Sequence, residues 1–170
     1  MTGPCFVDAN VFIYARDPRD AAKQTRAKEW RDHLWRAGQG RTSIQALSES
    51  YVTLRKLGGA SPDEIWESVE RFFAWKPLAV DEGLLRLAHQ LEQRYRVSWW
   101  DSLIVAAAQL QECELLLTED LQDGMAFGSV TVRSPFTLEV REAAAAYAVS
   151  ARIPSPHRRR GRPRRAAAPA

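Results

Sequence analysis

Residues 4–14 have the sequence PCFVDANVFIY, which contains the first predicted strand and the first acid of the chain. The apolar run Cys5-Phe6-Val7 has the length and composition of a buried strand in a parallel sheet, and it stops abruptly at the carboxylate of Asp8. We therefore place Asp8 at the carboxyl end of a strand. In open α/β sheets ligands bind at that edge, because the following loops and helix starts leave a crevice there.

The size of the chain, 170 residues and 19.2 kDa, suits a single domain. The two cysteines, Cys5 and Cys113, lie beside apolar residues and form no CxxC pair. We predict that both are small buried hydrophobic residues, in preference to a disulfide or a zinc site. The sequence has no run of about 18 apolar residues and no cleavable leader, so we expect a cytoplasmic protein without membrane contact.

The charge is distributed unevenly along the chain. Residues 151–170 contain seven arginines and no acidic residue, so the net charge of +3 less these seven leaves −4 for residues 1–150. We expect a folded domain over 1–150 and a disordered tail over 151–170, because the tail is rich in Pro, Arg and Ala and has almost nothing to bury. Since the domain is mildly acidic, any polyanion has to be held by local patches or through cations.

Strand and helix patterns alternate along the domain, which indicates parallel βα units. The segment Ser61-Pro62-Asp63-Glu64 is a capping box and marks the clearest helix start. The helix after it is expected to turn both Phe72 and Phe73 inward. Expected strands cover 5–7, 78–80, 115–118 and 130–132, and residues 42–44 form either a very short strand or the lead-in to a helix. Expected helices cover 11–15 as a short turn, 21–37, 44–57, 62–75, a segment capped by Asp81, a very apolar segment opened by 98–101, and 138–149.

Acidic residues from four separate segments fall at one predicted edge of the sheet. Asp8 follows the first strand, and Glu119 and Asp120 follow the strand at 115–118. Asp101 lies in the first turn of a helix, and Glu49 lies in an early turn of another. Strand carboxyl ends and the starts of the helices that follow them share one edge, so these acids can meet in a single crevice.

Carboxylates gathered in this way raise one another's pKa unless a cation neutralises them. Mg²⁺ and Mn²⁺ are the natural candidates, because they take hard oxygen ligands. Such a site suits phosphodiester hydrolysis, in which a metal lowers the pKa of a bound water. No histidine base is needed, which agrees with the wide separation of His33, His89 and His157. Asn10 can bind a metal water or a phosphate oxygen through its amide.

Each acid also has an ordinary structural role open to it. Asp8 can cap the turn that follows it, Asp101 can stabilise the dipole of its helix, and Glu49 can lie on a solvated helix face. Glu119 and Asp120 can be loop acids. The coincidence of four such segments favours the metal site over these separate roles.

Four motifs together resemble the PIN-domain family, and most closely the VapC-type toxins of bacterial toxin-antitoxin pairs. The motifs are FVDANVFIY at 6–14, TSIQ at 42–45 leading to Glu49, SWWDSLIVAAA at 98–108 and LTEDL at 117–121. The resemblance covers about residues 4–136. It implies a Rossmann-like α/β fold with a central parallel sheet flanked by helices, an Mg²⁺- or Mn²⁺-dependent endoribonuclease that acts on RNA, a homodimer, and a small DNA-binding antitoxin that blocks the site.

Matched position by position, the resemblance assigns roles to the acids. Asp8 and Asp101 look like the principal metal ligands, and Glu49 looks like a third acid that binds metal directly or through water. Asp120 most resembles the fourth acid.

The same matching leaves one assignment open and adds a supporting residue. Glu119 and Asp123 are close enough in sequence that either can replace Asp120 as the inward acid. Thr118 is expected to orient a metal water or the attacking hydroxide.

Two aromatic or basic features lie outside this assignment. Trp99 and Trp100 suit a core or a subunit interface, with base stacking near the site as the alternative. Residues 157–165 resemble an AT-hook for the DNA minor groove, with a non-specific polyanion tether or an inconsequential tail as the alternatives. The arginines concerned are Arg158, Arg159, Arg160, Arg162, Arg164 and Arg165.

Two other functions stay open on the sequence. One is a PIN-like nuclease that acts on structured DNA or in RNA maturation. The other is a non-catalytic DNA-binding protein that works through its basic tail, with structural acids.

Overall fold

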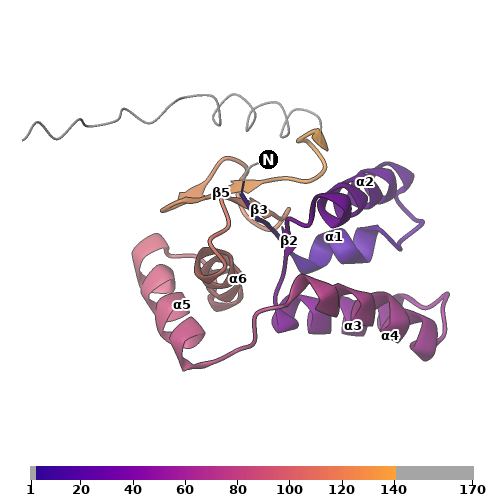
Figure 1. The fold of residues 1–170 in the computed structure, drawn as a ribbon, viewed down its shortest axis with the longest axis horizontal. Coiled ribbons are helices and arrows are strands. Elements are labelled where there is room, and N and C mark those ends of the chain that lie inside the picture. Colours follow the sequence, from indigo (N-terminus) through magenta and orange to yellow (C-terminus); the bar gives the residue numbers. More distant parts are fainter. Residues whose placement is uncertain (1–2, 141–170) are drawn as a thin grey trace, which may run out of the picture.

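The computed structural model describes residues 3–140, and a five-stranded sheet lies at its centre (Figure 1). The spatial order of the strands is β2-β1-β3-β5-β4. Neighbouring strands are parallel except for β4, which is antiparallel to β5. The strands are β1 Cys5–Val7, β2 Gly40–Arg41, β3 Leu115–Leu117, β4 Ala126–Phe127 and β5 Val130–Arg133. The expected α/β fold with a mainly parallel sheet of short strands is confirmed.

Helices flank this sheet in two groups, with α1 to α4 on one side and α5 and α6 on the other (Figure 1). Their bounds are α1 Ala9–Tyr14, α2 Ala21–Ala37, α3 Ile44–Leu57, α4 Pro62–Glu70, the 3₁₀ helix η1 Arg71–Trp75, α5 Glu82–Tyr95 and α6 Trp99–Leu110.

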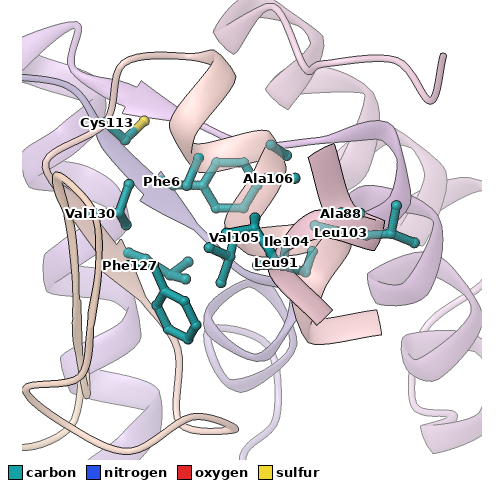
Figure 2. Close-up of a cluster of buried hydrophobic side chains, with 14 of the residues drawn as sticks. Phe6, Ala88, Leu91, Leu103, Ile104, Val105, Ala106, Cys113, Phe127 and Val130 are labelled. Carbon is teal, nitrogen blue, oxygen red and sulfur yellow. The ribbon is translucent and has the colours of Figure 1, made fainter. Parts of the chain in front are cut away.

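The alternating side chains of the short strands feed two separate cores, because successive residues of a strand point to opposite faces. Phe6 and Leu116 belong to the core cluster that includes residues of α5 and α6, and Figure 2 shows Phe6 beside Ala106 and Val105 of α6. Val7 and Leu117 pack on the other face with Trp30 of α2. The central strands are therefore covered on both faces, as expected of a parallel sheet.

The most apolar helix, α6, is buried on all sides along its middle. All seven residues from Ser102 to Ala108 are buried, which confirms the expected packing. Cys113 follows this helix, and it and Cys5 are buried free thiols, as predicted. Burial raises the pKa of Cys113 to about 12, so this thiol stays protonated and inert. Within residues 3–140, no helix has the length and apolarity that a membrane span requires.

Side-chain caps explain why the helix starts could be predicted from the sequence. The Ser61 hydroxyl accepts from the backbone N–H of Glu64, and the Glu64 carboxylate accepts from the backbone N–H of Ser61, so the capping box is confirmed. Other helices begin with the same chemistry, in which a side-chain oxygen accepts from a backbone N–H of the first turn. These caps are Asp8, Asp20, Ser43, Asp81 and Ser98.

The helix expected over 62–75 is split in two. The α-helix ends at Glu70, and η1 continues to Trp75 with a tighter winding. Lys76 then takes a left-handed conformation with φ 52°, and the proline that follows it cannot continue the helix, so the helical segment ends here. The prediction that Phe73 faces inward was wrong, because its side chain is 43% exposed.

Trp75, at the end of η1, packs directly over Gly40 of β2. A Cβ atom at Gly40 would lie 2.5 Å from the indole ring, which is far inside van der Waals contact. The absence of a side chain at position 40 therefore lets the ring lie against the edge of the sheet.

The strand expected over 78–80 is absent, and that prediction was wrong. Leu78 forms a single parallel bridge with Ser43, and Val80 is 51% exposed. The reason is the partner: Ser43 turns at once to cap α3, so no further residue is available for pairing. Of the two alternatives for residues 42–44, the structure shows the lead-in to a helix, because Ser43 caps α3. A separate short strand, β2, precedes it at Gly40–Arg41.

The helix predicted over 138–149 lies almost wholly outside the described residues. The predicted disordered tail, 151–170, and its AT-hook-like arginines also lie outside them.

Candidate active site

The site is built on Asp8, which follows β1 and caps α1. Its Oδ1 accepts a hydrogen bond from the backbone N–H of Ala9 at 2.7 Å. Its Oδ2 accepts from the hydroxyl of Thr118, the residue after β3, also at 2.7 Å. Because β1 and β3 are adjacent parallel strands, the two side chains meet at the carboxyl edge of the sheet.

Thr118 connects Asp8 to two further polar residues. Its oxygen accepts from Nδ2 of Asn10 at 2.9 Å and from the backbone N–H of Asp120 at 3.1 Å. The same Nδ2 lies 3.3 Å from Oδ2 of Asp120. Since Thr118 gives its single proton to Asp8 and accepts two hydrogen bonds, its hydroxyl is saturated. Its visible role is to hold Asp8 and Asp120 in place.

One oxygen of this network has no partner. Oδ1 of Asn10 is the buried side-chain nitrogen or oxygen atom that lacks a hydrogen bond within the described part of the chain. A buried acceptor left unpaired is costly, and it marks a place where a water or a cation can bind.

Asp8 is buried in the site, and this burial has the largest effect on the pKa of its carboxyl group. The carboxylate is 6% exposed. Loss of hydration raises its pKa from 3.8 to about 7, against the hydrogen bonds from Thr118 and Ala9, which lower the pKa. The negative charges of Asp120 and Glu49 add to the increase.

Glu49 and Asp101 lie at the rim of the same site. Glu49 is in the second turn of α3, and its pKa is raised by partial desolvation and then by the charges of Asp120 and Asp101. Asp101 is in the first turn of α6, where the hydroxyl of Ser98 donates to it at 2.7 Å. Glu49 is thus within electrostatic reach of Asp8, Asp120 and Asp101, and it connects the four acids.

The three acids that follow β3 separate clearly in the structure. Asp120 takes part in the network with Asn10. Glu119 points away and pairs with Lys23 at 2.5 Å. Asp123 pairs with Arg133 at 3.0 Å and accepts from the backbone N–H of Ser134. Of the three, Asp120 is the one that joins the site.

Lys23 was not identified from the sequence. Its ammonium group donates to Glu119 and to the hydroxyl of Tyr14 at 3.1 Å, and it lies 4.4 Å from the centroid of the Tyr14 ring and 4.8 Å from that of Phe136. The bond to Glu119 raises the pKa of Lys23. Lys23 thus anchors the loop that carries Asp120. No local pattern marks it, because one lysine on a polar helix face looks like any other.

A family model for the PIN domain matches residues 5–122, which contain every acid of the site. The chain belongs to the PIN domain family. PIN domains are generally nucleases, and PIN nucleases typically use divalent metals. Among solved structures, one chain of a "Toxin-antitoxin complex from Klebsiella pneumoniae" is similar, with a TM-score of 0.54 and 21% sequence identity over 79% of this chain and 99% of that chain. No curated protein matches the sequence significantly.

The donor set of this PIN domain fits a divalent ion in its chemistry. Asp8, Asp120 and the free Oδ1 of Asn10 supply hard oxygen atoms, which Mg²⁺ and Mn²⁺ prefer. Within residues 3–140, no three acidic, histidine or cysteine side chains form a compact group ready to hold a metal.

The tryptophan pair beside Asp101 is divided between core and surface. Trp99 packs against the core cluster of α5 and α6. Trp100 is 66% exposed, which leaves its ring free to contact a partner. The first residue agrees with the expected core role, and the second does not.

Proposed function

We propose that this PIN domain is a divalent-metal-dependent endoribonuclease and the toxin of a toxin-antitoxin pair. The observation that carries the proposal is Asp8, a buried carboxylate with a pKa of about 7 that has only neutral hydrogen-bond donors and carboxylates around it. Such a group is charged at neutral pH where a cation binds it and otherwise takes up a proton, so a raised pKa together with neighbouring carboxylates favours a cation site.

Five residues would serve as ligands of the metal, and a sixth would hold one of them in place. Asp8 and Asp120 would bind Mg²⁺ or Mn²⁺, with Glu49 and Asp101 as further ligands, directly or through water, and Oδ1 of Asn10 as a neutral donor. A bound divalent ion lowers the pKa of water and stabilises charge on phosphate oxygens. Thr118 keeps Oδ2 of Asp8 fixed, so the carboxylate presents a constant direction to its ligand.

The choice of substrate and partners rests on likeness. The structurally similar chain comes from a toxin-antitoxin complex, which supports an antitoxin partner for this protein. The proposal further includes RNA as the substrate and a homodimer of this chain. Co-expression with the product of a short adjoining reading frame tests the antitoxin: it should bind the PIN domain and suppress its cleavage.

The decisive experiment is cleavage by the purified full-length chain. We expect labelled single-stranded RNA to be cut with Mg²⁺ or Mn²⁺, to stay intact with a chelator, and to be cut again when metal is restored. Structured DNA in a parallel reaction tests the alternative substrate. Sequencing the RNA ends after brief induction in cells identifies the cleaved bond. Undiminished RNA cleavage in the chelator would refute the proposed chemistry.

Asp101→Asn provides a second check on the same site. Asp101 lies at the rim and is half-exposed, so the substitution leaves the core intact. We expect the variant to fold normally and to lose cleavage. A fully active Asp101→Asn protein would remove this residue from the proposed ligand set.

A further inference from the structure

A basic groove crosses the surface where α2 and the end of α1 meet α4 and η1. It consists of three adjoining hollows of about 280, 50 and 300 Å³. The first two share Arg31, Arg71 and Phe72, and the last two share Arg16 and Leu54, so they follow one another along the surface. We call this feature the arginine groove, after Arg16, Arg19, Arg31, Arg36 and Arg71 that line it.

The arginine groove carries an excess of positive charge. Its acids are Asp17 and Asp32, and each already pairs with one arginine of the groove, Arg19 and Arg31 respectively. The remaining three guanidinium groups form no ion pair within residues 3–140. Arg36 donates to a backbone carbonyl, that of Asp32.

Arg16 and Arg71 are the least constrained of the five arginines. Both side chains are exposed, and neither makes a side-chain hydrogen bond or an ion pair with any other described residue, although the hydrogen bonds from Ser61 and then the charge of Arg16 lower the pKa of the nearby Glu64. Guanidinium groups in this state have donors available for phosphate oxygens.

One end of the groove presents an aromatic surface. Trp35 is 43% exposed, although large aromatic side chains are usually more fully buried. Its ring packs edge-on against Phe72, with centroids 5.7 Å apart, and tilts against Trp75 at 6.0 Å. These contacts hold the indole in place while part of it stays open to solvent. A fixed aromatic ring beside guanidinium groups is the combination that binds single-stranded nucleic acid, because the ring stacks a base and the cations hold the backbone.

Helix α1 contributes residues to both the acidic site and the arginine groove. α1 begins at the site, with Asn10, and its later residue Phe12 lines the middle hollow. From Asn10 to Arg16 the chain advances by about 9 Å, at the helical rise. Phe12 follows Asn10 by two residues, about 200° around the helix, so the groove opens on the other side of α1 from Asn10. An RNA strand that occupies both the acids and the groove has to pass around the helix. The acidic edge repels phosphates, so cationic residues nearby are needed to retain the strand.

We propose that the arginine groove binds single-stranded RNA on one side of the cleaved bond, with Arg16 and Arg71 on phosphates and Trp35 stacked on a base. RNA as the ligand rests on the proposed function. The binding itself requires no catalysis, so the two proposals fail separately.

The test measures binding of a fluorescent single-stranded RNA to the full chain in a chelator, where no cleavage occurs. The double variant Arg16→Gln/Arg71→Gln should weaken binding at least about fivefold. It should also reduce the slope of log K against log salt by about 1.4, because two phosphates of a single strand are no longer neutralised. The matched control is Arg86→Gln/Arg94→Gln, which removes the same charge from α5, and it should bind as wild type does. Equal effects of the two double variants, no effect of the groove variant, or no binding by wild type would each overturn the proposal.

The aromatic part of the proposal has its own readouts. Trp35→Leu should weaken RNA binding at least about fivefold, and Trp35→Phe should retain most of it, because a phenyl ring still stacks. Thermal unfolding of both variants shows whether folding is intact. As a localising measurement, 4-thiouridine RNA should photocrosslink to a peptide that contains Trp35. Crosslinks confined to α5 or to residues 151–170 would contradict the proposal.

An acidic protein segment is the competing occupant of a basic aromatic groove. A 20-residue poly-glutamate peptide should displace the RNA less effectively than unlabelled RNA of equal charge, since it has no bases to stack on Trp35. Equal displacement would assign the groove to an acidic protein partner and would overturn the proposal that RNA occupies it. In cleavage assays, the groove variant should raise KM for long RNA with kcat nearly unchanged, whereas loss of a metal ligand lowers kcat.

Discussion

Two aspartates at opposite ends of α1 have nearly the same burial and opposite titration. Asp8, before the helix, is 6% exposed, and Asp17, after it, is 5% exposed. The guanidinium of Arg19 donates to both oxygens of Asp17 at 2.6 to 3.0 Å, and this lowers the pKa of Asp17. Asp8 has only neutral donors, and desolvation raises its pKa to about 7.

The difference shows that burial by itself does not identify a functional acid. Asp17 pairs with Arg19, two residues further along the chain, so its charge is neutralised within the fold. Asp8 has no cation in its surroundings and has other carboxylates nearby instead. A buried acid of the second kind requires a partner from outside the chain, and for this reason it marks the site.

Neutralising Asp8 and Asp17 in turn should give the largest difference between them. Asp8→Asn should lower kcat for RNA cleavage at least about 1000-fold, because a principal metal ligand is lost. Asp17→Asn, a control of the same chemistry and similar exposed fraction, should leave kcat within about twofold. The comparison uses kcat because Asp17 lines the arginine groove, where its loss frees Arg19 and changes KM. Steady-state cleavage by both purified variants decides the matter. Comparable losses would show that the two acids do not differ in function.

The pH dependence of stability should have opposite signs at the two residues. Folded metal-free protein keeps the Asp8 proton up to about pH 7, whereas the unfolded chain loses it near 3.8, so rising pH favours unfolding between these values. The cost reaches up to about 4 kcal/mol above pH 7, at 1.36 kcal/mol per pKa unit. Asp8→Asn removes this cost. Denaturant unfolding of wild type and variant in a chelator, from pH 4 to pH 8, should show a stability difference that grows with pH in favour of the variant.

For Asp17 the sign is reversed. Its folded pKa is lowered, so its contribution is present above the unfolded pKa near 4 and is lost as the pH falls through the folded value. Asp17→Asn should therefore be less stable than wild type at neutral pH, with the difference closing in acid. A difference between this variant and wild type that is constant across the acid range would contradict the assignment.

A smaller effect is expected from the lysine that anchors the loop after β3. Lys23→Met keeps the length of the side chain but releases Glu119, and with it the position of Asp120. We expect kcat to fall about tenfold and the Mg²⁺ concentration for half-maximal activity to rise, as for residues that orient a metal ligand. Glu119→Gln should give a similar but weaker change. Additive losses in the double variant would mean that the two residues act independently.

Binding of Mg²⁺ itself should give the smallest of these effects. Saturating Mg²⁺ should raise the melting temperature of wild type by a few degrees at pH 8, and less at pH 5, where Asp8 is protonated. Asp17→Asn should show the same increase, and Asp8→Asn should show little. An increase that is equal in all three proteins would place the bound ion elsewhere.

The elements that the sequence predicted correctly are those with local causes. Helices α2 and α3 have the expected bounds, 21–37 and 44–57, because caps and terminating glycines lie within a few residues of their ends. Asp8 could be placed at a sheet edge because an apolar run ends on it. The segment 78–80 has strand-like composition, but whether it pairs depends on Ser43, and composition does not encode that.

The parts of the site that were not predicted depend on contacts between residues far apart in the sequence. Glu119 and Asp120 are adjacent and chemically similar, and their roles separate only because Lys23, 96 residues away, pairs with the first. The arginine groove could not be predicted from the sequence for the same reason. Its residues come from the end of α1, from α2 and from η1, and in sequence each is an ordinary surface arginine.

The contact between Gly40 and Trp75 links the edge of the sheet to the wall of the arginine groove. Trp75 supports Trp35, so a methyl group at position 40 would push one indole and thereby tilt the other. Positions 40 and 75 should consequently change together during evolution: where a homologue has a bulkier residue at 40, a smaller one should replace the tryptophan at 75.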